Sequence, residues 1–332
     1  MGLREHNEVD SRVSVLPPPL RISVLIPCYN EELTIANVID SFRAELPDAR
    51  IYVFDNNSTD RTVEYAREKG AIILRERRQG KGFVVQSMFR EINADIYVMV
   101  DGDGTYPAAS VHSLLEPVMK NDADMVVGSR LDPNSHSQFR MMNRLGNHLF
   151  LFLTQTLFGA RINDMLSGYR VFNRNMVKQL PLLSSGFEIE TELTIKALER
   201  GYRVIELPVN LSSRPEGSYS KIRHIHDGFL ISSMILSLAR DYKPLTVFGA
   251  AGLVILVLGL ILGISVILEF TRTGLISRLP SAVLSVGLVL SGLITGMVGL
   301  VLHTVARRFQ ELDVQLRLLG RELLDSNRGK GQ

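Results

Sequence analysis

The chain has 332 residues, in which 37 Lys and Arg stand against 35 Asp and Glu for a net charge of +2. This near balance gives no electrostatic sign of a nucleic-acid partner, and we expect none. The single cysteine, Cys28, excludes an intramolecular disulfide and a cysteine-based metal cluster.

The first twenty residues hold no long apolar run, so we expect residues 1–20 to form a flexible arm rather than a secretory signal. From residue 21 onward, short apolar runs alternate with segments that have the period of a helix. Strands that alternate with helices predict an α/β domain with a mostly parallel, Rossmann-like sheet. The expected strands are 21–27, 51–54, 71–74, 97–100 and 124–128, and an edge strand is expected at 207–209.

Two aspartates follow the fourth of these runs, in Asp101-Gly102-Asp103-Gly104-Thr105. If the run is a buried strand, both carboxylates lie at the carboxyl end of the sheet, where open α/β folds bind their ligands. Carboxylates in such a place call for a cation, and Mg²⁺ or Mn²⁺ would take these hard oxygen ligands together with substrate phosphates. An ordinary Asp/Gly turn is the alternative.

Two uncharged segments, 244–268 and 279–306, are each long enough to cross a bilayer. Within residues 244–306 we expect transmembrane helices at about 245–268 and 280–303, joined by a short loop into a hairpin. By the positive-inside rule, the large domain and both termini are then cytoplasmic, in a multi-pass protein of the plasma (inner) membrane. The basic residues that set this orientation are Arg240, Lys243, Arg307 and Arg308.

Two further segments are amphipathic. Residues 222–243 suit a helix that lies in the membrane interface. The cytoplasmic tail, 307–332, suits either self-association as a homo-oligomer or packing under the domain, and its pattern does not choose between them. The apolar residues that recur in the tail are Phe309, Leu312, Leu316, Leu319 and Leu323.

Five motifs in a fixed order carry a resemblance to a known family: VLIPCYNEE, DNNSTDRT, GKG, VDGDGTYP and VVGSR. The set resembles family-two glycosyltransferases with the GT-A fold, in particular the polyprenyl-phosphate sugar synthases, such as dolichol-phosphate mannose synthase and bacterial undecaprenyl-phosphate glycosyltransferases. The resemblance implies a nucleotide-diphospho-sugar transferase domain at 21–221. It also implies transfer of one sugar, with inversion, from a nucleoside diphosphate sugar to polyprenyl phosphate at the lipid bilayer.

By this resemblance, the loops after the first two strands hold the nucleotide, and Lys81 between two glycines meets a phosphate. Asp55 would accept hydrogen bonds from the ribose or base, while Ser58 or Thr59 caps the next helix. Helix capping by Asp55 and a solvated position for Lys81 are the alternatives. The residues expected to bind the nucleotide sugar are Pro27, Tyr29, Asn30, Glu32, Asp55, Asn57, Lys81 and Asp101.

The resemblance also assigns metal ligands. Asp101 and Asp103 match the metal motif of the family, and Asp101 would also touch the ribose. Many relatives have Asp-Ala-Asp-Leu-Gln here and use the glutamine to hold the metal. This chain has Thr105 at that position, so Thr105 is the candidate third ligand, and water is the alternative.

Basic residues downstream are expected to bind phosphate. An arginine after the fifth strand would grip a phosphate with its guanidinium, and two arginines four residues apart share one face of a helix. A later Arg/Lys loop resembles one that closes over pyrophosphate. A solvated surface position is the alternative for each. The residues are Arg130, Arg140, Arg144, Arg214, Ser220 and Lys221.

An acidic segment follows. Glu188, Glu190 and Glu192 would share one face of a strand, or favour the start of a helix. Because an acceptor phosphate is already ionised near neutral pH, a base is not required, and we expect Glu190 to position the acceptor. The full set of expected catalytic residues is Asp101, Asp103, Arg130 and Glu190.

The expected donor is UDP-linked, with GDP as the alternative, and the sequence does not identify the sugar. One alternative is a hydroxyl-directed polysaccharide or glycolipid synthase, which would carry a Gln-x-x-Arg-Trp motif, and this chain has no tryptophan. The other is a non-catalytic membrane scaffold that keeps the sugar-nucleotide fold. The intact Asp101, Asp103 and Lys221 argue against the scaffold.

Overall fold

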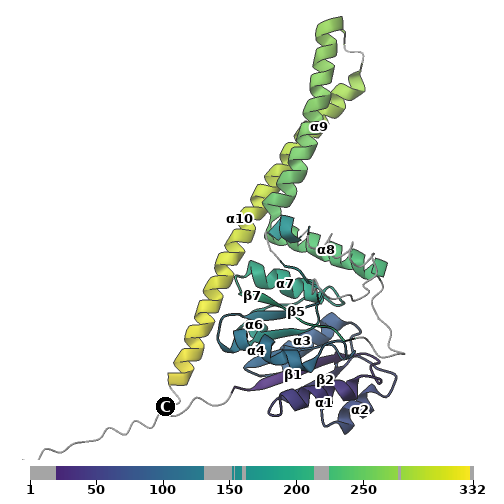
Figure 1. Ribbon diagram of the computed structural model, residues 1–332. Helices are drawn as coiled ribbons and strands as arrows, with labels where there is room; N and C mark the ends of the chain where they lie inside the picture. Colours follow the sequence, from purple (N-terminus) through teal and green to yellow (C-terminus); the bar gives the residue numbers. More distant parts are fainter. Residues whose placement is uncertain are drawn as a thin grey trace, which may run out of the picture.

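The computed structural model describes residues 20–130, 152, 154–158, 162–212, 224–275 and 278–329. Figure 1 shows an α/β domain from which two long helices project side by side. The elements in chain order are β1 (Ile22–Cys28), α1 (Ile35–Glu45), β2 (Arg50–Asp55), α2 (Thr62–Glu68), β3 (Ile72–Arg75), α3 (Lys81–Glu91), β4 (Ile96–Met99), η1 (Ala108–Ser110), α4 (Val111–Met119), β5 (Met125–Ser129), β6 (Arg170–Asn173), α6 (Arg174–Gln179), α7 (Ile189–Glu199), β7 (Val204–Pro208), α8 (His224–Tyr242), α9 (Pro244–Thr273) and α10 (Leu279–Gly329).

The strands form one sheet in the order β3-β2-β1-β4-β6-β5-β7. Neighbouring strands are parallel except for β6, which lies antiparallel between β4 and β5. The expected α/β class with a mostly parallel sheet is therefore confirmed, and the strand expected at 207–209 is β7, at the sheet edge.

Helices cover both faces of the sheet, which gives the domain three layers (Figure 1). Along β1, Val24 and Ile26 pack on one face with α1, while Leu25 packs on the opposite face with α3. The apolar cluster on the α1 face also includes residues of α2 and α4, and the apolar cluster on the α3 face includes residues of α6 and α7. A strand buried on both faces has no polar side to alternate with, so its sequence is a continuous apolar run.

The parallel strands bring their carboxyl ends to one edge of the sheet. Cys28 at the end of β1 pairs with Asp55 at the end of β2, and Leu25 pairs with Met99 at the end of β4. The loops after these three strands consequently leave the sheet beside one another. Asp101 lies two residues beyond β4, in this cluster of loops.

The helix α8 joins the domain to the projecting helices. Its buried Ile231, Ile235 and Leu238 form an apolar cluster with residues of the domain. Just beyond its end, Lys243 pairs with Glu199 of α7 at 3.2 Å. These contacts hold the start of α9 close to the domain.

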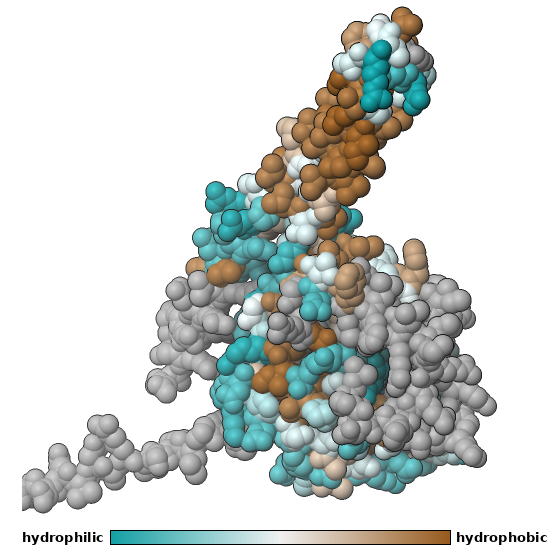
Figure 2. Space-filling view, turned by 45° about the horizontal axis from the view of Figure 1, so that its top comes forward, coloured by the Kyte–Doolittle hydropathy of each residue, from teal (hydrophilic) through white to brown (hydrophobic). Residues whose placement is uncertain are grey.

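Two of the described helices, α9 (Pro244–Thr273) and α10 over Leu279–Leu316, are long and apolar enough to cross a membrane, and their most apolar 18-residue windows have mean hydropathies of 3.0 and 2.1. Only 11% and 17% of the residues in their most apolar windows are buried. Figure 2 shows the resulting band of hydrophobic surface along the projecting pair. A core helix of a water-soluble domain would cover these side chains, so the pair associates the chain with a membrane.

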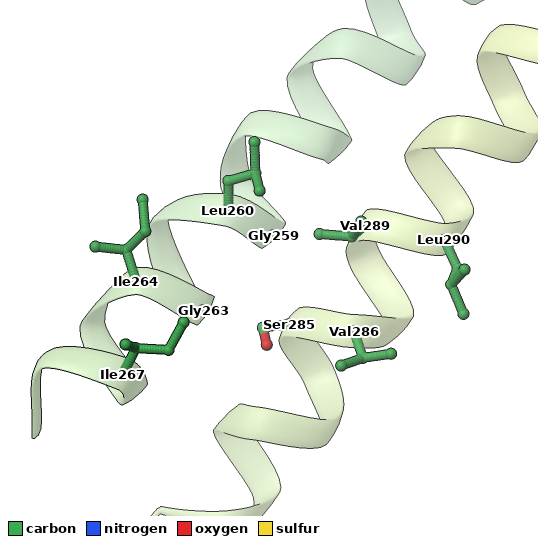
Figure 3. Close-up of a pocket in the computed structure, with 9 residues that line it drawn as sticks. All are labelled: Gly259, Leu260, Gly263, Ile264, Ile267, Ser285, Val286, Val289 and Leu290. Atoms are coloured by element: carbon green, nitrogen blue, oxygen red, sulfur yellow. The ribbon is translucent and has the colours of Figure 1, made fainter. Parts of the chain in front are cut away.

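Glycines let α9 and α10 pack closely. A Cβ added at Gly292 would lie 2.7 Å from the backbone nitrogen of Leu256, and one added at Gly259 would lie 2.8 Å from that of Val289. Small residues at such a seam let two helix backbones approach in a membrane. Figure 3 shows where the seam opens into a groove of about 240 Å³, with Ser285 and Val289 pointing toward α9.

We expect Gly292→Leu to destabilise the helix pair, because its side chain would meet the backbone of α9. The loss should be about 1–3 kcal/mol, the usual range for overpacking. The matched control is Gly287→Leu, in the same helix, where an added Cβ meets nothing within 4 Å. Thermal unfolding of the purified protein in detergent measures both, and equal melting temperatures for the two variants would contradict the tight seam.

Candidate active site

A lysine joins two carboxylates at the carboxyl edge of the sheet. The Nζ atom of Lys81 lies 2.6 Å from Oδ1 of Asp101 and 2.5 Å from Oε1 of Glu190. The three residues come from the first position of α3, the loop after β4 and the first turn of α7. The side chains of Lys81 and Glu190 are only 12% and 3% exposed, so this contact is shielded from water.

Burial acts on both charges of the pair. It opposes the ammonium of Lys81, but Asp101 and Glu190 outweigh burial and raise the pKa of Lys81 above its ordinary value. Burial raises the pKa of Glu190, and Lys81 partly offsets that rise. Lys81 is therefore positively charged at neutral pH, and its charge favours the ionised form of Glu190.

The two glycines beside Lys81 serve protein packing. A Cβ added at Gly80 would lie 2.1 Å from the carbonyl oxygen of Ser185, and one at Gly82 would lie 2.1 Å from that of Ser184. The backbone N–H of Gly82 also donates to the Ser185 carbonyl at 3.0 Å. The segment before α7 thus packs directly against both glycines, and the expected phosphate contact of Lys81 stays a prediction. This packing brings Lys81 to Glu190.

Asp103 and Thr105 form a local pair. Oδ1 of Asp103 accepts hydrogen bonds from the backbone N–H of Thr105 at 3.1 Å and from its hydroxyl at 2.7 Å. Thr105 therefore supports the buried Asp103 carboxylate. Its hydroxyl oxygen keeps its lone pairs, so the expected role of Thr105 as a metal ligand stays a prediction.

The carboxylate oxygens of Asp101 and Asp103 fit a cation that is bound partly by the protein and partly by the substrate. Carboxylate oxygens are the atoms that Mg²⁺ and Mn²⁺ prefer. In the described part of the chain, no group of three or more His, Cys, Asp or Glu side chains could hold a metal. Two carboxylates with further positions left to phosphate and water match a Mg²⁺-type site, and do not match a closed structural site.

A glycine lies directly against Asp101. A Cβ added at Gly168 would fall 2.2 Å from Oδ2 of Asp101, so only glycine leaves the carboxylate its place. The N–H of Gly168 donates to the hydroxyl of Tyr106 at 3.0 Å, which fixes this backbone. Burial raises the pKa of Tyr106 to about 12. This role of Gly168 was not predicted, because nothing in the local sequence around Gly168 or Asp101 indicates that the two loops meet.

Arg130 is bound to an aspartate. Its Nε and Nη2 atoms each lie 2.8 Å from an oxygen of Asp164, and its backbone N–H donates to the same carboxylate. Burial would raise the pKa of Asp164, but Arg130 more than offsets this and lowers it. A phosphate at Arg130 would have to use the rest of the guanidinium or share it with Asp164. The expected phosphate contact stays a prediction.

The loops after β1 and β2 are bonded to each other. Oδ1 of Asn30 accepts from the N–H of Thr59 at 2.8 Å, and Oε2 of Glu32 accepts from the N–H of Arg61 at 3.0 Å. The side chains of Asn30 and Glu32 thus stabilise the expected nucleotide-binding loops, and Tyr29 beside them is 39% exposed. Pro27 belongs to β1, at the same edge.

Asp55 holds its own turn. Its Oδ1 atom accepts from the N–H of Ser58 at 3.0 Å, and its carboxylate is buried. Ser58 accepts from the N–H of Asn30 and does not cap α2, so the expected cap was wrong. Asp60 accepts from the first residue of α2 in its place, at 3.0 Å. Asp60 rather than Ser58 accepts from the start of α2, because the Ser58 hydroxyl already accepts a hydrogen bond from Asn30 in the neighbouring loop.

Asn57 has a positive φ of 65°, and its amide donates to the carbonyl oxygen of Arg77 at 3.0 Å. It too links two loops at this edge. The remaining expected phosphate-binding residues lie outside the described part of the chain. They are Arg140, Arg144, Arg214, Ser220 and Lys221.

Comparisons with known proteins agree on one family. The family described as Glycosyl transferase family 2 matches residues 23–180. Glycosyltransferase AglJ of Haloferax volcanii is 34% identical over 278 residues, which is 83% of this chain and 91% of that protein. The UDP-N-acetylglucosamine–dolichyl-phosphate N-acetylglucosaminyltransferase of Methanococcus voltae is 27% identical over 241 residues, which is 65% of this chain and 95% of that protein.

A solved structure shows the same fold. It is the crystal structure of glucosyl-3-phosphoglycerate synthase from Mycobacterium tuberculosis with Mn²⁺, UDP-glucose and phosphoglyceric acid. It aligns with a TM-score of 0.54 at 22% identity, over 66% of this chain and 80% of that one.

We expect Lys81→Met to lower the free energy of unfolding by about 3–5 kcal/mol, because Glu190 would be left buried without its partner. The double variant Lys81→Met/Glu190→Gln should lose less than the single variant. The control is Lys69→Met, which breaks an exposed pair with Asp40 worth about 0–1 kcal/mol. Denaturant unfolding of these three variants and of the single variant Glu190→Gln checks this, and losses of Lys81→Met and Glu190→Gln that simply add in the double variant would show that Lys81 and Glu190 do not interact.

Proposed function

The chain belongs to glycosyl transferase family 2, and we propose that it moves one sugar from a nucleoside diphosphate sugar to polyprenyl (undecaprenyl) phosphate. The observation that carries the proposal is the pair Asp101 and Asp103 at the ligand edge of a domain docked on two membrane-type helices. That combination suits a soluble donor and an acceptor anchored in lipid. The product would be a lipid-linked sugar donor for cell-envelope glycans.

UDP is the donor nucleotide we favour. The relative from Methanococcus voltae is named for a UDP-sugar donor and a dolichyl-phosphate acceptor, and the crystallised neighbour was solved with Mn²⁺ and UDP-glucose. Asp101 and Asp103 would hold Mg²⁺ or Mn²⁺, which when bound neutralises the donor diphosphate. The loops that carry Asn30 and Asp55 are bonded together at the same edge and would hold the nucleotide.

The reaction needs little proton transfer, because the acceptor phosphate is already ionised. A phosphate oxygen of the lipid attacks the anomeric carbon and forms the new C–O bond. The bond from that carbon to the diphosphate breaks, and its electron pair leaves with the nucleoside diphosphate, which inverts the anomeric centre. The fixed charge of Lys81 would face the phosphates, and Glu190 would position the acceptor side.

The basic residues have a shared task in this scheme. Two phosphate-bearing substrates repel each other, and cations between them lower that repulsion. Arg130, held by Asp164, is the one of these arginine and lysine candidates that lies in the described part of the chain. The other proposed contacts are Arg140, Arg144, Arg214, Ser220 and Lys221.

Membrane topology follows from charge. Arg240 and Lys243 precede α9, and Arg307 and Arg308 follow the apolar part of α10. With α9 and α10 as a hairpin, the positive-inside rule puts the domain and both termini in the cytoplasm, in a multi-pass protein of the plasma (inner) membrane. This orientation would place the site where the lipid phosphate meets cytoplasmic sugar nucleotides.

A hydroxyl-directed synthase and a non-catalytic scaffold are the competing functions. A hydroxyl acceptor must lose a proton, so it needs a base that is free to accept one. Glu190 is the buried acid that we expect on the acceptor side, and it is already paired with Lys81. This pairing favours an acceptor that arrives ionised.

The test is a transfer assay with purified protein, undecaprenyl phosphate and a panel of nucleotide sugars, read by the mass of the lipid product. We expect one donor to give a product. Asp103→Asn should reduce transfer by roughly 10²–10³-fold, the usual effect of removing one group that stabilises developing charge. The control is Asp122→Asn, which changes an exposed aspartate away from the site. No product from any donor would refute the proposed function.

Thr105→Val separates the two roles open to Thr105. If the hydroxyl only supports Asp103, the variant should bind Mg²⁺ about 10–100-fold more weakly, as for other neighbours of metal ligands, and high Mg²⁺ should restore transfer. Transfer measured against Mg²⁺ concentration checks this. A Thr105→Val variant that Mg²⁺ cannot rescue would make Thr105 a direct ligand.

A further inference from the structure

An apolar stripe runs along the part of α10 that lies beyond its most apolar stretch. Its residues are spaced by four, three, four and three, the heptad spacing of a two-stranded coiled coil. All of them are exposed, from 45% for Val305 to 67% for Phe309. The stripe consists of Val305, Phe309, Leu312, Leu316 and Leu319, and the sequence continues the spacing with Leu323.

The stripe lies on a different face of α10 from the one that contacts the rest of the protein. Gly292 and Gly299 of α10 pack against α9. Asp313 lies fourteen residues, or two heptads, beyond Gly299 and therefore on the same face. It pairs with Arg200 of α7 at 3.8 Å. The stripe occupies the neighbouring face, and no described residue covers it.

A depression of about 250 Å³ lies on this face, lined by Thr304, Val305, Arg308, Phe309 and Leu312. With Phe309 at an a position, Val305 and Leu312 are the flanking d positions and Arg308 is the g position. In a parallel coiled coil, each a side chain enters a hole formed by four residues of the facing helix. Val305, Arg308, Phe309 and Leu312 are the four that would receive Phe309 of another helix.

Charge and anchoring identify the facing helix as a second copy of this chain. Two copies held in one membrane by the same hairpin present their tails in parallel. In a parallel pair, a g residue lies near the e residue five positions later on the other helix. Arg308 and Asp313 have this spacing and opposite charges. Arg308 now pairs with Glu311 in an exposed contact of low energy, so it is available to change partner.

We propose that the stripe on α10 is the interface of a parallel homodimer, with Phe309 of each copy in the depression on the other. The dimer is independent of the sugar-transfer reaction and would set two catalytic domains side by side on the membrane. Of the two roles that the tail sequence left open, self-association is the one that the uncovered stripe favours.

Cysteine cross-linking in membranes tests the interface. The native chain should form little disulfide-linked dimer by itself, because its one cysteine, Cys28, is buried. Leu312→Cys places a thiol at a d position, where two parallel helices face each other. Val314→Cys is the matched control, two residues away on the outer face, with 55% exposure against 49% for Leu312.

Under mild oxidation we expect Leu312→Cys to give a species of twice the chain mass, roughly tenfold more than Val314→Cys. Equal yields from the two variants, no dimer from Leu312→Cys, or a product with the mass of another protein would each overturn the proposal.

A second measurement does not depend on disulfide geometry. Light scattering of the native protein in mild detergent should give the mass of two copies, and Leu312→Glu/Leu316→Glu should give one. Val314→Glu should remain dimeric. An unchanged melting temperature of the catalytic domain would show that the double variant is folded. A native protein with the mass of one copy, or a double variant that stays dimeric, would refute the interface.

Discussion

The candidate site depends on one ammonium placed between two carboxylates. Lys81 contacts Asp101, which follows a strand of the sheet, and Glu190, which begins a helix far along the chain. A buried acid without a counter-charge would protonate or move, so the pairing favours the charged form of Glu190 and helps to hold it in place. The close packing of Gly80 and Gly82 on the segment before α7 brings the three residues together. Asp101, proposed to act on the donor side, and Glu190, proposed to act on the acceptor side, are thereby joined through one positive charge.

The surroundings of this unit are built for rigidity. Gly168 lies against Asp101, and Tyr106 holds the backbone of Gly168. Arg130 and Asp164 form a two-point pair at the next strand end. Side chains that the sequence pattern presents as ligand contacts thus also stabilise the loops. Preorganised charge of this kind suits a transfer reaction in which two phosphates must approach each other.

Several residues show which features the local sequence predicts and which it does not. The strand before Asp101 was predictable because a strand buried on both faces must be an apolar run, and both long helices were predictable from hydropathy. The roles of Thr105 and Ser58 were not. Ser58 accepts from the loop after β1, which its own motif does not include, and Thr105 donates to Asp103, a hydrogen bond that the metal motif alone does not predict.

The sequence by itself determined the fold class, the family and the two membrane-type helices, because these follow from periodicity, composition and ordered motifs along the chain. The tertiary structure alone decided that Lys81 joins Asp101 to Glu190, that Gly168 gives Asp101 its space, and that Arg130 is paired with Asp164. Each of these contacts crosses between segments far apart in the chain. Their energies come from burial and proximity, which exist only once the sheet has brought the loops to one edge.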